Sequence, residues 1–336
     1  MFATINQHII EFDAGEGRVL ADFLIEHSFD PYSSEATLEQ LVIESIRLCK
    51  VLPDRALKAL LGFRAHSNED GLLVLRGLPL DNRRIGPTPL HWSLEAQTKT
   101  SYDSEMYLMG TAALLGDVFA FSSQHQGNLI QNILPVPGDV YEQAGTSSKV
   151  FLDWHTEDSF HCLRADFVGL LCLRSHPSAA TTLASVKHMN LPQRYIECLF
   201  EPRFRITCFD DTAKGLLFID DGPAISVLYG SPDDPYVRYD IYCIKPNPGD
   251  AEAEEALAYF ASQIASVAHQ LVLQQGDLLF FDNHRVLHGR TAFTPRFDGT
   301  DRWLQRILIT ADLRKSRPAR VNHLRVVEMN DRRFLS

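Results

Sequence analysis

The second half of the chain is a succession of short apolar runs separated by turn residues, and this pattern limits the fold more than any other feature. The runs begin after about Leu129, and most are too short for helices. Many short strands with frequent turns are typical of a β-sandwich, a barrel or a jelly roll. The clearest runs are Val168–Leu173, Phe218–Ile219, Ala224–Tyr229, Tyr236–Ile244, Asp277–Phe281 and Trp303–Thr310.

The first part of the chain has a helical periodicity instead. Apolar residues recur at helical spacing over residues 38–48 and 57–61, and residues 93–121 are also mostly helical in pattern. Between them, the apolar run Gly71–Gly77 is bounded by glycines and predicts a strand. One later helix is expected over residues 251–273, where apolar side chains follow one helical face.

Together these patterns predict a mainly β fold with flanking helices, built on a double-stranded β-helix (a cupin-like jelly roll). No linker-like segment divides the sequence, so we expect one domain over residues 1–336. Residues 1–120 form its largely helical N-terminal part, packed on the jelly roll. Residues 121–336 supply most of the β core.

Composition narrows the class of protein. The chain of 336 residues is 45% hydrophobic, enough for a sizeable core, and its formal net charge of −11 argues against a nucleic-acid partner. The six cysteines form no CxxC pair and are expected to be free thiols in a reducing compartment. We see no signal peptide and no apolar run of membrane-spanning length, so a cytoplasmic enzyme without a membrane partner is expected.

A metal site is predicted by two separated histidines and a carboxylate. In Trp154-His155-Thr156-Glu157, residues i and i+2 point the same way along a strand, so His155 and Glu157 can reach one ion. The segment Gly276–Arg290 predicts a strand, a turn at Asp282–Asn283 and a second strand that brings His288 to the same place. Two histidines and one carboxylate leave neighbouring coordination positions open, as non-haem Fe(II) oxygenases require.

Two further histidines compete for this assignment. His284 and His288 have the i, i+4 spacing of zinc ligands on a helix, but strand-like runs surround them. In a strand the two side chains would be roughly 13 Å apart, at about 3.3 Å per residue. His161 lies close to His155 in sequence and is better explained as a loop residue or a neighbour of the ligands.

With these residues placed, the chain resembles the clavaminate synthase-like branch of the Fe(II)/2-oxoglutarate-dependent oxygenases. It is most similar to those that hydroxylate free arginine, lysine or asparagine. The resemblance runs from about Gly71 to Arg314, and in this branch the metal carboxylate is a glutamate, as Glu157 is. It rests on WHTEDSFH at Trp154–His161, RADFVGLLCLR at Arg164–Arg174, TTLAS at Thr181–Ser185, and HGR followed by two more arginines.

The resemblance implies Fe(II) as cofactor, 2-oxoglutarate and O2 as co-substrates, and roles for three further residues. Arg302 matches the arginine that grips the far carboxylate of 2-oxoglutarate, for which a guanidinium is well shaped. Thr182 matches a threonine that also binds this co-substrate. Arg306 matches an arginine that binds the substrate's α-carboxylate, and residues 302, 304 and 306 face the same way in a strand.

The same resemblance implies a substrate side-chain site. Asp240 falls where the arginine hydroxylases place an acidic residue, but Tyr242 stands where those enzymes have a second aspartate. One carboxylate and a phenol suit a compact ammonium better than a guanidinium, so we favour free L-lysine, hydroxylated at C3 or C4. Asp210 and Asp211 are expected to form a lid, and Glu157 is expected also to contact the substrate amine.

Several alternatives stay open at this point. The substrate could be L-arginine, L-asparagine or a carrier-bound amino acid, and the outcome could be desaturation rather than hydroxylation. A protein of another class, a cupin-like metal binder without turnover, is disfavoured because it would not need Arg302 together with a complete triad. The sequence carries no mark of the oligomeric state.

Overall fold

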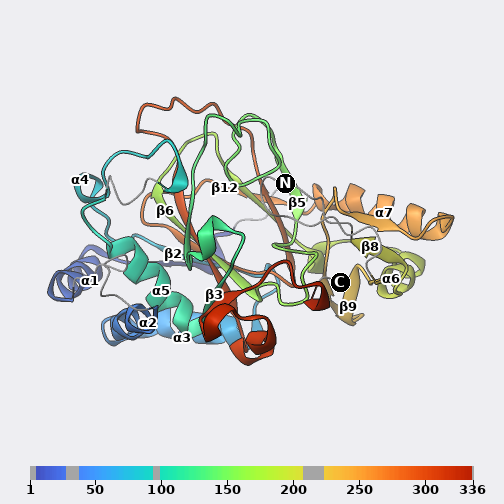
Figure 1. Cartoon of the computed structure of the whole chain (residues 1–336), viewed down its shortest axis with the longest axis horizontal. Helices are drawn as coiled ribbons and strands as arrows, with labels where there is room; N and C mark the ends of the chain where they lie inside the picture. Colours follow the sequence, from blue (N-terminus) through green and yellow to red (C-terminus); the bar gives the residue numbers. More distant parts are fainter. Residues whose placement is uncertain (1–4, 28–37, 94–98, 207–222, 335–336) are drawn as a thin grey trace.

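Two β-sheets form the core of the molecule (Figure 1). This computed structural model describes residues 5–27, 38–93, 99–206 and 223–334. In order, the larger sheet contains β1 (Ile9–Glu11), β2 (Leu72–Arg76), β13 (Leu278–Asp282), β6 (Phe167–Arg174), β15 (Trp303–Thr310), β3 (Asp117–Phe121) and β16 (Val326–Val327), with β4 (Ile130–Ile133) also paired to β15. The smaller sheet contains β12 (His269–Leu271), β7 (Thr181–Ser185), β14 (Val286–Arg290) and β5 (Leu152–His155).

The central strands are apolar on both faces because both faces are covered. In β6, Leu171 and Leu173 join a cluster with the helices, while Val168 and Leu170 join one with residues of the smaller sheet such as Leu183. This explains why the predicted run over residues 168–173 does not alternate with polar residues. Two short ribbons complete the β structure: β9 (Leu228–Ser231) with β10 (Asp234–Val237), and β8 (Phe204–Ile206) with β11 (Ile244–Pro246). The predicted jelly roll is thus confirmed.

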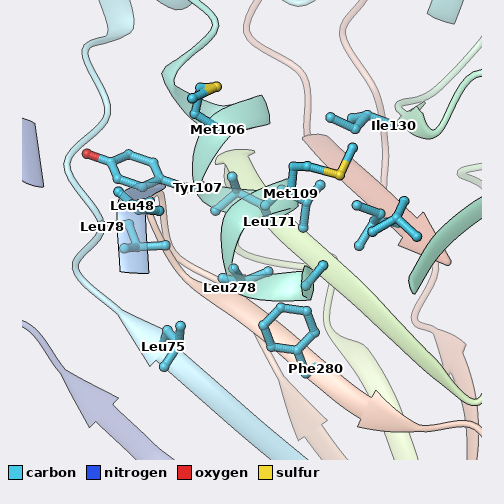
Figure 2. Close-up of a cluster of buried hydrophobic side chains, with 14 of the residues drawn as sticks. Leu48, Leu75, Leu78, Met106, Tyr107, Met109, Ile130, Leu171, Leu278 and Phe280 are labelled. Carbon is cyan, nitrogen blue, oxygen red and sulfur yellow. The ribbon is translucent and has the colours of Figure 1, made fainter. Parts of the chain in front are cut away.

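The helices gather on two sides of the β core (Figure 1). One group is α1 (Ala14–Glu26), α2 (Leu38–Ile46), α3 (Asp54–His66), α4 (Asn82–Ile85) and α5 (Asp103–Leu115); the other is α6 (Gln193–Phe200) and α7 (Ala251–Ile264). Figure 2 shows Met106, Tyr107 and Met109 of α5 in one buried cluster with Leu171 of β6 and Phe280 of β13. No helix in the described ranges is long and apolar enough to cross a bilayer.

Three local predictions need correction. The helix predicted to reach residue 273 ends at Ile264, and β12 follows because Leu271 pairs with Thr181 of β7. Residues 93–121 end in β3 rather than in a helix, so the N-terminal 120 residues supply β1, β2 and β3 as well as helices. The turn after β13 does not close a hairpin within one sheet: β13 lies in the larger sheet and β14 in the smaller one.

Candidate active site

Two neighbouring strands of the smaller sheet, β5 and β14, bring His155, Glu157 and His288 together. His155 ends β5, Glu157 follows two residues later, and His288 on the neighbouring β14 is in register with His155. One ligand atom from each of the three lies within 4.8 Å of the other two, and within the described parts of the chain this is the only such group of histidine, cysteine or acidic residues. The predicted triad is therefore assembled on adjacent strands.

The protonation of the triad suits a divalent metal. His155 donates its Nδ1 proton to the carbonyl oxygen of Asp153 at 2.7 Å, which leaves Nε2 free as a ligand. Burial and the nearby His155 lower the pKa of His288 to about 4, so that its imidazole is neutral. Burial alone would raise the pKa of Glu157, but Arg306 and His288 bring it well below its usual range. Two imidazole nitrogens and an ionised carboxylate form a donor set that fits Fe(II).

Gly289 permits this close packing of β14 and β5. A Cβ atom at Gly289 would lie 2.3 Å from the carbonyl oxygen of Leu152, far inside van der Waals contact. The pairing of β14 with β5 also shifts register between His288 and Arg290. A side chain at position 289 would therefore push β5, and His155 with it, away from His288.

The triad opens into a cavity of about 570 Å³ between the sheets. Its walls carry two kinds of charged side chain. The basic ones are Arg290, Arg302 and Arg306, and the acidic ones besides Glu157 are Glu142, Asp153 and Asp240. The cavity thus offers separate places for anionic and cationic groups beside one metal site.

Arg302 is a buried cation at the inner wall of the cavity. Its side chain donates to the Thr181 hydroxyl at 3.5 Å, and no carboxylate of the described residues pairs with it. Burial lowers its pKa to about 10, so it stays protonated at neutral pH. A buried guanidinium without an acidic partner is costly, which points to an anionic ligand.

The structure places a different threonine from the predicted one beside Arg302. Thr181, in register with Arg290, faces the cavity, whereas Thr182 is on the opposite face of β7. The buried Oγ1 of Thr182 has no hydrogen-bond partner and points toward Gly289. The hydroxyl beside Arg302 therefore belongs to Thr181.

Arg306 bonds both to Glu157 of the triad and to Gln131 of β4. It donates to Oε1 of Glu157 at 2.6 Å and to Oε1 of Gln131 at 2.9 Å from its Nε. The other oxygen of Glu157, Oε2, lies 3.5 Å from Nε2 of His288. With Oε2 on the metal side, Oε1 already has a cationic partner, and a substrate amine would have to share it.

Asp240 and Tyr242 lie where the peptide passes alongside β5. Asp240 forms an isolated bridge with His155, and its Oδ1 accepts from the backbone N–H groups of Tyr242 and Cys243. The Tyr242 hydroxyl donates to Oδ2 of Asp153 at 2.5 Å, and this bond raises its pKa to about 12. Both predicted residues therefore line the cavity, whereas the predicted lid residues Asp210 and Asp211 fall outside the described residues.

The two competing histidines lie apart from the triad. His284 bonds through Nε2 to Asp166 at 2.6 Å and through Nδ1 to the Tyr229 hydroxyl. It lines a separate, smaller cavity. His161 is fully buried, and its Nδ1 accepts the backbone N–H of Leu163 at 3.0 Å. Neither belongs to the metal group.

The sequence interpretation missed Asp153 and Arg290, although a signal was present for both. Each is two residues from a histidine of the triad, Asp153 before His155 and Arg290 after His288. Because alternate residues of a strand share a face, this spacing alone indicates that both side chains can face the metal site. Gln131, the partner of Arg306, has no such signal, because its position depends on the pairing of β4 with β15.

Known proteins resemble this chain over most of its length. The model of the family described as "Taurine catabolism dioxygenase TauD, TfdA family" matches residues 194–308. The enduracididine beta-hydroxylase of Streptomyces hygroscopicus is 36% identical over 80% of this chain and 85% of its own. For the L-asparagine oxygenase of Streptomyces coelicolor the values are 40%, 78% and 77%, and for the L-lysine 3-hydroxylase of Catenulispora acidiphila 34%, 82% and 77%.

A solved structure supports the same relationship. The non-heme iron oxygenase OrfP in complex with Fe and alpha-ketoglutaric acid has a TM-score of 0.85 and 35% identity, over 95% of this chain and 99% of that one. The cofactor and co-substrate predictions, Fe(II) and 2-oxoglutarate, are confirmed by these relatives together with the triad. The chain belongs to the TauD/TfdA family of 2-oxoglutarate-dependent dioxygenases, in the clavaminate synthase-like branch of Fe(II)-dependent amino-acid hydroxylases.

Proposed function

We propose that the protein hydroxylates a free basic L-amino acid, first of all L-lysine at C3 or C4, and converts 2-oxoglutarate to succinate. The observation that carries this proposal is the pair of carboxylates, Asp153 and Asp240, in the same cavity as the triad. They lie on β5 and on the segment next to it, while Thr181 is on β7, two strands away from β5. A substrate cation and an anionic co-substrate would thus approach the metal from different sides.

His155, Glu157 and His288 would hold the iron, which when bound activates O2 through oxidative decarboxylation of 2-oxoglutarate and oxidises a substrate C–H bond. Arg302 and Thr181 would hold the far carboxylate of the co-substrate, since a guanidinium and a hydroxyl can both donate to it. The protein's own contribution is orientation and exclusion of water, and it needs no catalytic acid or base for this reaction.

The amino acid would be held at both ends. Arg306 would take its α-carboxylate, as the family pattern implies, while remaining bonded to Gln131. Asp240 would take the side-chain cation, with Asp153 beside it. Because the Tyr242 hydroxyl is bonded to Asp153, the phenol bounds the site and adds no second carboxylate to it. This favours the compact ammonium of lysine over the broad guanidinium of arginine.

Arginine is the second candidate. Two acidic side chains, Asp153 and Asp240, line the same part of the cavity, and a guanidinium could use both if the Tyr242 hydroxyl moved away. A replacement of Tyr242 by phenylalanine would release Asp153 without adding charge. If arginine is the natural substrate, this variant should improve its KM and leave that of lysine nearly unchanged.

The proposal is tested by measuring succinate from the purified protein with Fe(II), ascorbate, 2-oxoglutarate and each of the twenty amino acids in turn. Mass spectrometry of each mixture identifies the product. We expect one added oxygen on lysine, with about one succinate per product. Norleucine is the matched control, because it has the length of lysine without the ammonium, and it should react poorly. Equal turnover of norleucine and lysine would refute recognition of the cation by Asp240.

A further inference from the structure

Arg290 is a second buried arginine whose charge the mechanism above leaves unused. Its side chain is 3% exposed, and it lines the same cavity as Arg302. It follows His288 by two residues on β14 and is in register with Thr181 on β7. Two residues of a strand span about 6.6 Å, so Arg290 stands one step from the metal along the strand, beside the hydroxyl that Arg302 contacts.

The hydrogen bonds of Arg290 all reach residues 147–150, which follow a stretch of the cavity wall in the chain. It donates to the carbonyl oxygen of Ser147 at 2.6 Å, to Oγ of Ser147 at 2.9 Å and to the carbonyl oxygen of Val150 at 3.3 Å. The Phe293 ring lies 5.0 Å from the guanidinium carbon. The residues just before this segment, 142–145, line the cavity. Arg290 therefore ties the wall to the strand that carries His288.

Charge balance shows what this arrangement lacks. Arg290 and Arg302 line one cavity and both lie beside Thr181, because Arg290 is in register with Thr181 and Arg302 donates to its hydroxyl. No carboxylate in the described parts of the chain pairs with either guanidinium, and Nε of Arg290 is buried without a partner. Two buried like charges destabilise each other, and an anion bound beside them would offset that cost. The group that meets this need is the far carboxylate of 2-oxoglutarate.

We propose that Arg290 is a positioning residue for 2-oxoglutarate: with Arg302 it supplies the positive field that holds the far carboxylate, and it couples that carboxylate to residues 147–150, next to the wall residues 142–145. Binding of 2-oxoglutarate then reduces the mobility of the wall residues against which the amino acid packs. This inference rests on the dioxygenase activity of the family and is independent of which amino acid is hydroxylated. Arg290 acts through Arg302 and Ser147, and the iron ligands remain as described.

The test compares Arg290→Gln, which removes the charge, with Arg290→Lys, which keeps it. Calorimetry measures 2-oxoglutarate binding to protein loaded with Mn(II) in place of Fe(II). We expect Arg290→Gln to raise the Kd for 2-oxoglutarate roughly 30-fold and Arg290→Lys to raise it less than about fivefold, with Mn(II) affinity unchanged in both. An unchanged Kd in Arg290→Gln with only a lower Tm would show that Arg290 is merely structural and overturn the proposal. If Arg290→Gln does not fold, a loss above 30-fold in Arg290→Lys would equally refute the role of charge.

Hydrogen exchange tests the coupling to the wall. In the Mn(II)-loaded wild type, 2-oxoglutarate should slow amide exchange in peptides covering residues 147–150. In Arg290→Lys this slowing should be lost although the ligand still binds, because a compact ammonium lacks the planar fork of donors that reaches both Ser147 and Val150. Slowing that persists in the variant would overturn the coupling. A wild type that binds no 2-oxoglutarate would instead contradict the dioxygenase assignment itself.

Discussion

The two sides of the triad are built differently. On the side of β7 and β14, Arg302 and Arg290 are only 6% and 3% exposed, and no described carboxylate pairs with them. On the side of β5 and the segment beside it, Tyr242 is 47% exposed and already bonded to Asp153. The first side is closed and carries buried cations, whereas the second is open and its Asp153 carboxylate already accepts a hydrogen bond from Tyr242.

This difference indicates which half of the site stays constant among related enzymes and which half can vary. The co-substrate is the same for every enzyme of this kind, so a deep, rigid set of donors suits it. The relatives are named after different amino acids, enduracididine, asparagine and lysine, so the other side must accommodate change. A side chain on an open edge can be exchanged at little cost to stability, since surface substitutions usually change it by less than about 0.5 kcal/mol.

The largest effect is expected where both sides meet. His288→Ala should abolish iron binding and turnover, because only one imidazole and one carboxylate would remain. The matched control is His284→Ala, because His284 lies in the turn just before β14 and bonds to Asp166 outside the cavity. It should lower the Tm and keep the iron. Anaerobic titration with Fe(II) measures both, and a His288→Ala variant that still binds iron tightly would contradict the triad.

Arg302→Ala should impair the closed side alone, so that 2-oxoglutarate binds more weakly. Loss of a buried charged partner costs about 3 kcal/mol, so the Kd for 2-oxoglutarate should rise by more than about a hundredfold. Iron affinity should change little, because Arg302 contacts none of the three ligands. Calorimetry with Mn(II)-loaded protein gives the Kd, and Arg302→Lys should recover part of the loss. A co-substrate Kd close to that of the wild type would show that the closed side does not bind 2-oxoglutarate.

Asp240→Asn should impair the open side alone, so that the amino-acid substrate binds more weakly. If the ammonium pair is shielded from water, its loss costs about 2 kcal/mol, or roughly a 30-fold rise in the KM for lysine. The Kd for 2-oxoglutarate should stay the same, which separates this variant from Arg302→Ala. Turnover of norleucine, which lacks the ammonium, should also be unaffected. A lysine KM that does not change would make Asp240 a structural residue of the segment beside β5.

Much of the fold could be predicted because local patterns and tertiary structure agree. The apolar run at residues 168–173 is buried on both faces of β6, and residues 303–310 form β15 as predicted. The helix over residues 251–273 was drawn too long because Ala268 and Leu271 keep a helical spacing while lying at or in β12. Only the pairing of β12 with β7 distinguishes the two structures, and that contact joins residues about 90 positions apart in the chain.

The metal ligands could be predicted because residues i and i+2 of a strand share a face. A His-x-Glu pair can therefore reach one ion on any strand whose face points inward. The second strand needed only to place one histidine beside them, and β14 does so. The threonine could not be assigned in the same way, because Thr181 and Thr182 are adjacent and a shift of one residue reverses the face. Which of the two points inward depends on the register with Arg290 and His288 of β14.

The smallest expected effect therefore decides the finest point, the choice between these two threonines. Thr181→Val should weaken 2-oxoglutarate binding by about 1 kcal/mol, the value of one hydrogen bond, or roughly fivefold in Kd. Thr182→Val removes a buried hydroxyl that has no partner, so it should leave the Kd unchanged and keep or raise the Tm. The two variants have the same change in shape one residue apart, so each controls for the other. If Thr182→Val raised the Kd for 2-oxoglutarate and Thr181→Val did not, β7 would present its other face to the co-substrate. The assignment of Thr181 to this side of the site would then be wrong.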